Sequence, residues 1–154
     1  MKMRVRVGLM PVVALTMMGA APPRPKGPCD IYGAAGTPCV AAHSTTRALY
    51  ASYQGPLYQL KRASDGKTLD VGIVAPTAAD AGGHANAAAQ DAFCAGTLCV
   101  INRIYDQSGK GNHLLQAPPG PLFPGPAKGG FDTQPIADMA PITISGHQAY
   151  GVYM

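Results

Sequence analysis

Alternating apolar and polar residues in the middle of the chain predict a β-hairpin. The alternation runs through residues 57–62 and resumes at residues 69–73, and the intervening residues 64–67, Ser-Asp-Gly-Lys, are a turn signal. Because side chains along a strand alternate between two faces, each strand of this hairpin has one apolar face for a core.

Two more regions have the apolar pattern of strands. Residues 98–105 are apolar around two central polar residues, which predicts a strand buried on at least one side. Apolar residues recur between positions 142 and 153 on both sides of Ser145-Gly146, which predicts two short strands joined by a turn.

Only short helical segments are expected. The Ala-rich residues 87–93 predict a short helix, and a hydroxyl among residues 44–46 is expected to cap one helical turn at residues 47–50. Residues 117–135 contain six prolines and four glycines, which predicts a long ordered loop. Short strands, long loops and no long helix favour an all-β chain of the β-sandwich class.

The first part of the chain has the pattern of a secretory signal peptide, predicted over residues 1–21. Three basic residues are followed by an apolar stretch at 7–18 and by small residues at 19–21. The apolar stretch is too short to span a bilayer, which needs about 20 residues; an uncleaved anchor or a buried strand is the alternative. The Pro-rich residues 22–28 predict a stiff linker, with the folded part beginning near Cys29.

Charge and acid composition narrow the possible functions. Five of the twelve basic residues lie in the first 26 positions, so the remainder of the 154-residue chain carries about −1, which does not support a basic patch for nucleic acid. All eight acidic residues are Asp, and the chain has no Glu. A mechanism that needs a Glu therefore cannot operate on this chain alone.

The four cysteines, Cys29, Cys39, Cys94 and Cys99, agree with export. Four cysteines allow three pairings, and separations of ten and five residues favour two local bridges, Cys29–Cys39 and Cys94–Cys99. A zinc site built from all four is the alternative, but these spacings do not match the paired C-x2-C pattern.

Other residues that could bind a metal ion or act as a nucleophile are interpreted as having structural roles. Residues 106–113 begin like a calcium loop but lack the regular acidic ligands and terminal Glu of an EF-hand, so they are predicted to form a structural turn. Ser44 and Ser108 lack the G-x-S-x-G context of a serine hydrolase.

The four histidines are far apart without an H-x-x-x-H pair and are interpreted as polar loop residues: His43, His84, His113 and His147. Three tyrosines, which either stack on a sugar or pack in the core, are expected to pack: Tyr50, Tyr53 and Tyr58.

Blocks of sequence from about Gly27 to the last residue are together similar to one enzyme family. They are GPCDIY at 27–32, GTPCVAAHSTTRALY at 36–50, GPLYQLKRASDG at 55–66, AQDAFC at 89–94, IYDQSGKGN at 104–112, QAPPG at 116–120 and GHQAYGV at 146–152. In this order they resemble glycoside hydrolase family 54, the α-L-arabinofuranosidase B enzymes.

The resemblance implies a β-sandwich catalytic domain of the jelly-roll or concanavalin type. Such an enzyme removes terminal α-L-arabinofuranosyl groups from arabinan and arabinoxylan with retention, using a Glu nucleophile, an Asp acid/base and a vicinal cysteine pair at the sugar pocket. A C-terminal arabinose-binding β-trefoil module usually follows. The resemblance also implies the disulfides Cys29–Cys39 and Cys94–Cys99.

In this family the catalytic residues lie downstream of the region that the chain matches. Residues 29–154 are therefore expected to be an incomplete, N-terminal part of the catalytic sandwich. A retaining glycosidase needs two carboxylates about 5–5.5 Å apart, and the Asp residues present fall mainly at turns. No catalytic, cofactor-binding or metal-binding residue is predicted.

Three functions are compared. The first is a secreted glycoside hydrolase whose partner is an arabinose-containing plant polysaccharide, acting outside the cell with no cofactor, no nucleic acid and no membrane contact after signal cleavage. The second is a noncatalytic, carbohydrate-binding sandwich of the laminin-G-like type, and the third is a secreted structural or adhesive domain. The spread of the blocks over the whole chain favours the first.

Overall fold

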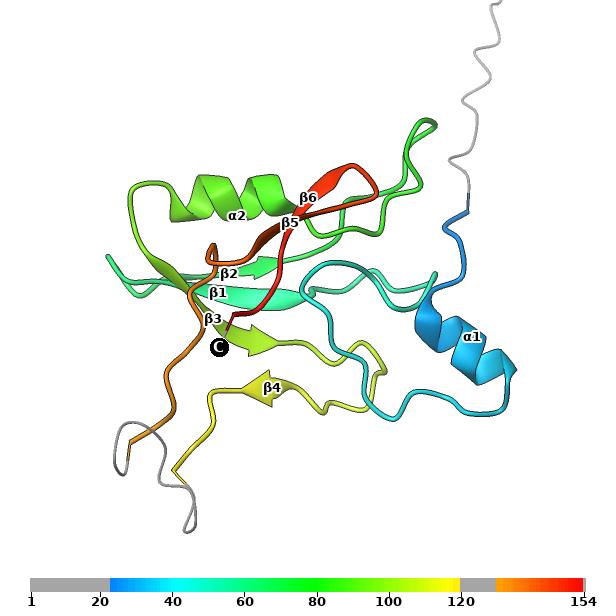
Figure 1. Cartoon of the computed structure of the whole chain (residues 1–154), viewed down its shortest axis with the longest axis horizontal. Coiled ribbons are helices and arrows are strands. Elements are labelled where there is room, and N and C mark those ends of the chain that lie inside the picture. Colours follow the sequence, from blue (N-terminus) through cyan, green and yellow to red (C-terminus); the bar gives the residue numbers. More distant parts are fainter. Residues whose placement is uncertain (1–22, 120–129, 154) are drawn as a thin grey trace, which may run out of the picture.

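A computed structural model describes residues 23–119 and 130–153 (Figure 1). The predicted signal peptide at 1–21 and the middle of the predicted loop at 117–135 lie outside the described residues. Within the described part, neither helix is long and apolar enough to cross a membrane.

The larger sheet has four antiparallel strands in the order β2-β1-β3-β4. The strands are β1 (Tyr58–Arg62), β2 (Thr68–Val71), β3 (Cys99–Ile104) and β4 (Leu114–Leu115). A second sheet is the antiparallel hairpin of β5 (Pro141–Ile144) and β6 (His147–Tyr150). The helices are α1 (Pro28–Ala34) and α2 (Ala87–Cys94). Two antiparallel sheets and two short helices give the all-β class that the sequence predicts.

Strand β1 occupies the centre of the larger sheet because both of its edges are paired. Its Tyr58 and Leu60 are 0 % exposed and lie opposite Val71 and Leu69 of β2. On the other edge, Leu60 pairs with Ile101 of β3. The alternation in the sequence thus puts one row of large apolar side chains into the core.

The opposite face of the same sheet is polar. Gln59 donates to Asp70 on β2 (2.9 Å) and accepts from Asn102 on β3 (2.7 Å), and the Tyr105 hydroxyl also donates to Asp70 (2.8 Å). These are cross-strand pairs of residues that alternate with the buried row. The strand period therefore separates an apolar face from a hydrogen-bonded polar face.

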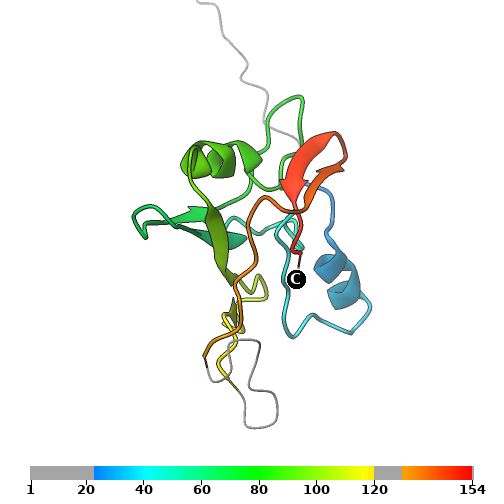
Figure 2. The same ribbon diagram turned by 60° about the vertical axis from the view of Figure 1, so that its left-hand side comes forward.

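Helix α2 and the β5–β6 hairpin lie together over the sheet (Figures 1 and 2). Gln90 of α2 is 1 % exposed; it accepts from the Tyr58 hydroxyl at 2.7 Å and donates to the Ala137 carbonyl at 2.9 Å. Tyr150 of β6 donates to Asp91 of α2 at 2.7 Å, which joins the hairpin to the helix. Burial raises the pKa of the Tyr58 hydroxyl well above its usual range, so this group stays a donor.

Most strand and helix predictions are confirmed. The predicted hairpin is β1–β2, the strand at 98–105 is β3, and the two short strands around Ser145-Gly146 are β5 and β6. The helix predicted at 87–93 is α2, whose first turn is capped by Asn86 accepting from the Ala89 amide at 3.1 Å.

The helical turn predicted at residues 47–50 is wrong. Ser44 does accept from the amides of Thr46 and Arg47, each at 3.2 Å, but residues 47–50 form no helical turn and Arg47 forms a β-bridge with His84. The bridge is possible because a segment distant in the sequence offers its backbone groups, a partner that local propensity does not reveal.

Two elements are absent from the sequence predictions. Helix α1 begins at Pro28, the last residue of the predicted linker, because proline is favoured in a first turn and because Asp30 accepts from the Gly27 amide at 2.8 Å. Strand β4 has only two residues, both exposed, so its alternation is too short to recognise.

The cysteines form Cys29–Cys39 and Cys94–Cys99, with Cα–Cα distances of 5.6 and 5.8 Å. These are the two local bridges that the spacing favours, and they leave no thiolate for the alternative zinc site. The second bridge fixes the end of α2 to the start of β3.

The first prediction concerns the buried Tyr58–Gln90 hydrogen bond. Tyr58→Phe leaves the Gln90 oxygen buried without its donor, which is expected to lower the free energy of unfolding by about 1–3 kcal/mol. Urea unfolding measures this. The control is Tyr153→Phe, at a residue 63 % exposed, where a change within about 0.5 kcal/mol is expected. Equal effects of the two substitutions would contradict the role of the bond.

Candidate functional site

The buried Asp106 carboxylate is hydrogen-bonded both to its own loop and to the loop that contains Ala42. It accepts from the amides of Ala42 (2.8 Å), Ser108 (2.9 Å) and Asn112 (3.0 Å) and from the Ser108 hydroxyl (2.8 Å). Burial raises the pKa of Asp106, but these hydrogen bonds outweigh burial and hold the pKa well below its usual range. Residues 107–110 form a turn within this loop, so the turn predicted at 106–113 is confirmed.

The neighbouring Gln107 extends this connection. Its side chain accepts from the Leu49 amide at 2.7 Å and donates to the Arg47 carbonyl at 3.2 Å, and its own amide donates to the Ala42 carbonyl at 2.8 Å. Residues 42–49, which have little regular structure, are thereby held in place by the loop after β3.

Other aspartates also have structural positions. Asp30 accepts from the amides of Gly27 (2.8 Å) and Ala51 (2.7 Å), and these bonds lower its pKa. Asp65 in the β1–β2 turn pairs with Arg62, which lowers its pKa. Asp65 has the turn position that the sequence predicts, whereas Asp30 lies in the first turn of helix α1.

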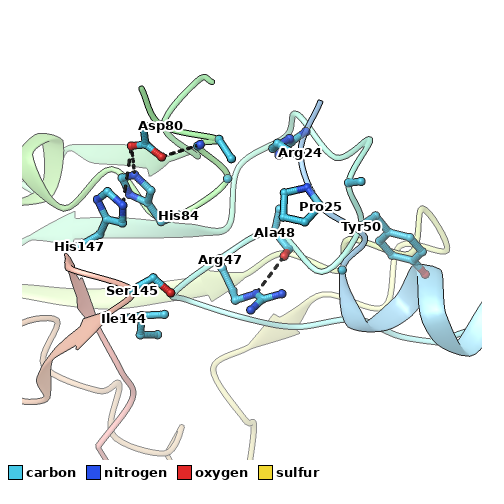
Figure 3. Close-up of a pocket in the computed structure, with 15 residues that line it drawn as sticks. Arg24, Pro25, Arg47, Ala48, Tyr50, Asp80, His84, Ile144, Ser145 and His147 are labelled. Atoms are coloured by element: carbon cyan, nitrogen blue, oxygen red, sulfur yellow. Dashed lines mark hydrogen bonds and ion pairs between the residues drawn. The ribbon is translucent and has the colours of Figure 1, made fainter. Parts of the chain in front are cut away.

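A cavity of about 230 Å³ opens beside these loops (Figure 3). Four segments line it: the chain before α1, the loop at 47–51, the loop at 80–84 and the tip of the β5–β6 hairpin. Arg47 donates from Nε to the Ala48 carbonyl at 3.4 Å, and Arg24 donates to the Tyr53 carbonyl, so a backbone carbonyl engages each arginine.

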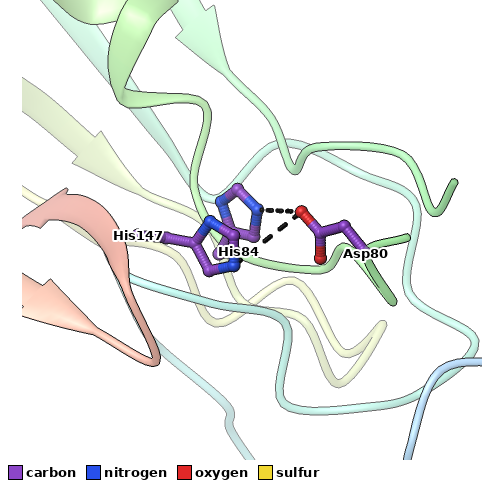
Figure 4. Close-up of side chains that lie close together, drawn as sticks. All are labelled: Asp80, His84 and His147. Atoms are coloured by element: carbon purple, nitrogen blue, oxygen red, sulfur yellow. Dashed lines mark hydrogen bonds and ion pairs between the residues drawn. The ribbon is translucent and has the colours of Figure 1, made fainter.

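Asp80, His84 and His147 converge on one side of the cavity (Figure 4). His84 Nε2 lies 3.1 Å and His147 Nε2 lies 3.8 Å from Asp80 Oδ2. The two imidazole rings are stacked, with centroids 3.8 Å apart and planes inclined by 12°. A carboxylate and an imidazole from one loop and a second imidazole from β6 could together bind a ligand, and the sequence predictions do not contain this group.

Local backbone geometry orients Asp80. Its Oδ1 accepts from the Gly82 amide at 2.8 Å, and this bond, followed by the bond with His84, lowers its pKa. Gly82 has φ +64°, and a Cβ there would lie 2.5 Å from the Val74 carbonyl oxygen. The loop therefore needs glycine at this position to present Asp80 to the histidines.

Of the other histidines and tyrosines considered in the sequence analysis, only Tyr50 lines this cavity. His43 contacts the Asn112 carbonyl at 2.6 Å, and His113 accepts from the Asp106 amide at 3.0 Å. Tyr58 is buried, and Tyr53 donates to the Pro56 carbonyl, so both pack as predicted.

Comparison with known proteins identifies the family. A family model described as "Alpha-L-arabinofuranosidase B, catalytic" matches residues 28–154. A probable α-L-arabinofuranosidase B of Aspergillus fumigatus is 65 % identical over 128 residues, 83 % of this chain and 24 % of that protein. The α-L-arabinofuranosidase of Hypocrea jecorina is 61 % identical over 128 residues, again 83 % of this chain and 24 % of that protein.

A solved structure gives the same result. The crystal structure of an arabinofuranosidase complexed with arabinofuranosyl-α-1,2-xylobiose matches with a TM-score of 0.77 and 58 % identity, over 83 % of this chain and 25 % of that one. The fold is therefore part of a glycosidase β-sandwich. The chain belongs to the α-L-arabinofuranosidase B family, glycoside hydrolase family 54, and spans about a quarter of the length of the curated relatives it matches.

The second prediction concerns acid sensitivity at Asp106. Because its pKa is lowered in the folded state, its charge stabilises the fold above the ordinary Asp pKa of about 3.9 and stops doing so as the pH falls through the lower folded value. Asp106→Asn, which removes this charge, is expected to cost about 1–3 kcal/mol at pH 7.

The difference between wild type and Asp106→Asn is expected to shrink as the pH falls below about 4. Urea unfolding across this pH range measures it, with Asp138→Asn as a control at an exposed position. A difference that stays constant or widens in acid would be inconsistent with a stabilising carboxylate.

Proposed function

We propose that the protein is an α-L-arabinofuranosidase and that residues 28–154 form the N-terminal part of its catalytic β-sandwich. The observation that carries the proposal is the match of these residues to the family's catalytic model. Identities of 57–65 % to the first curated relatives, several named α-L-arabinofuranosidase B, support the same activity.

The proposed substrate is an arabinose-containing plant polysaccharide such as arabinan or arabinoxylan. The solved relative with arabinofuranosyl-α-1,2-xylobiose supports this class, because that ligand joins an arabinofuranosyl group to a xylose chain. Another relative was soaked, as a Glu-to-Gln mutant, with 4-nitrophenyl α-L-arabinofuranoside. We propose that hydrolysis retains configuration, as in the family that the sequence resembles.

The nucleophile in this proposal comes from outside the present sequence. Retaining hydrolysis uses one carboxylate as the nucleophile and a second as the acid/base, and the family nucleophile is a Glu, which these 154 residues do not contain. The hydrogen bonds already assigned to Asp30, Asp65 and Asp106 support structural roles for these residues. The contribution of this segment is then to build the sandwich that positions the catalytic groups.

We also propose that the protein is secreted. A basic start, an apolar stretch and small residues form a signal-peptide pattern at residues 1–21. Two disulfides support this localisation, because such bonds persist mainly in oxidising compartments. The plant polysaccharide proposed as substrate is likewise extracellular.

The third prediction tests whether this segment serves an active enzyme. In a chimera, residues 28–154 replace the matching segment of the Aspergillus fumigatus relative, and the chimera is expected to release 4-nitrophenol from 4-nitrophenyl α-L-arabinofuranoside. The 154-residue chain alone is expected to release none, because loss of acid/base catalysis alone costs about 10²–10⁴-fold. Both proteins are assayed from the culture medium, and recovery of the 154-residue chain there also tests secretion by its own residues 1–21.

The alternative, a noncatalytic carbohydrate-binding sandwich, predicts the reverse pattern. The chimera would then fold, as judged by a cooperative melt, but stay inactive, while the short chain would bind arabinoxylan. Activity in the short chain that is lost on substitution of one of its own Asp residues would show instead that the catalytic groups lie within these residues.

A further inference from the structure

We infer that Asp80, His84 and His147 form a binding site for a divalent transition-metal ion such as Zn²⁺, which ties the β5–β6 hairpin to the loop before α2 (Figure 4). Asp80 and His84 belong to the loop between β2 and α2, and His147 is the first residue of β6. The inference rests on this arrangement and is independent of the proposed function.

The distances suit a tetrahedral ion after a small adjustment. Bonds of about 2.0–2.1 Å place tetrahedral ligand atoms about 3.3 Å apart. Asp80 Oδ2 lies 3.1 Å from His84 Nε2 and 3.8 Å from His147 Nε2, and all three potential ligand atoms lie within 4.8 Å of one another. Binding needs His147 to approach Asp80 by about half an ångström and its ring to turn out of the stack, because the lone pairs of near-parallel rings do not converge on one ion.

The surroundings prepare His84 and Asp80 as ligands. His84 Nδ1 lies 3.3 Å from the Ala85 carbonyl, which accepts the Nδ1 proton when Nε2 binds a metal ion in place of its hydrogen bond to Asp80. Asp80 keeps its other oxygen on the Gly82 amide at 2.8 Å. Hydrogen bonds of this kind behind the ligands orient them and strengthen metal binding.

The two imidazole Nε2 atoms lie near the same carboxylate oxygen, and the ring stack opens when both bind one ion. Their ring centroids are 3.8 Å apart, and both Nε2 atoms lie within 3.8 Å of the same Asp80 oxygen. A dication attracts the carboxylate and can bind both ring nitrogens at once. A proton, by contrast, is bonded to only one nitrogen.

The ligand types select the class of ion. Two imidazole nitrogens and one carboxylate oxygen suit Zn²⁺, Cu²⁺, Ni²⁺ or Co²⁺, whereas Ca²⁺ and Mg²⁺ prefer sets of oxygen ligands. The three side chains are between 16 and 36 % exposed and border the 230 Å³ cavity, so a fourth coordination position is open to water. Three protein ligands plus an open position is a known zinc arrangement.

Two arginines share the cavity and would repel a cation if they pointed at it. Arg47 donates to the Ala48 carbonyl, and Arg24 donates to the Tyr53 carbonyl; in Figure 3 both side chains lie apart from the Asp80–His84–His147 group. The competing explanation is a metal-free Asp–His hydrogen bond beside a stacked ring, and the experiment must separate the two.

Zinc affinity is measured on the full 154-residue chain, without a histidine tag, by competition with a fluorescent chelator. The disulfides leave no cysteine thiol to interfere. One Zn²⁺ per chain is expected, and Asp80→Asn, His84→Gln and His147→Gln are each expected to weaken binding by roughly tenfold or more, at least the effect of losing a residue behind a ligand. His43→Gln, outside the cluster, is the matched control and is expected to bind like wild type.

A second measurement does not depend on variants. X-ray absorption at the zinc edge is expected to give two imidazole nitrogens and additional oxygen at about 2.0–2.1 Å. Wild-type affinity no greater than that of the three cluster variants, or a coordination shell without two imidazoles, overturns the site and leaves the metal-free Asp–His pair.

Discussion

The structure depends on one buried amide side chain. Gln90 is 1 % exposed, and its two hydrogen bonds reach residues 32 and 47 positions away, Tyr58 and Ala137. An amide buried without partners costs several kcal/mol, on the order of 2–7 depending on the reference state. Helix α2 can therefore cover the sheet only when β1 and the segment at Ala137 are both in place, and the core forms as one unit.

Around this core, the loops are held by disulfides and by hydrogen bonds from buried polar side chains. The disulfides close short loops, and Asp106 and Gln107 hold residues 42–49. Two of the sequence blocks that resemble the arabinofuranosidase family, 36–50 and 104–112, are thus joined by hydrogen bonds. This gives a physical reason why these loops, which have little regular structure, carry recognisable sequence, and it links the family assignment to the fold.

The sequence predicted the parts of the structure that depend on short-range signals. Residues 57–73 alternate and contain their own turn, and Cys94 and Cys99 are close enough to pair locally. It failed where partners are distant: Arg47 forms a bridge with His84, and the two exposed residues of β4 give no pattern. The cluster at the cavity joins His84 to His147 across more than sixty positions, so the spacing rules for metal motifs could not find it.

The central claim is that the sheet, α2 and the segment at Ala137 form one cooperative core through Gln90, and native-state hydrogen exchange tests it most directly. The account predicts that amides of β1, β3 and α2 exchange with one common free energy of opening, equal to that of global unfolding. Exchange of the α2 amides through a separate opening of much lower free energy, while β1 and β3 stay protected, would contradict it.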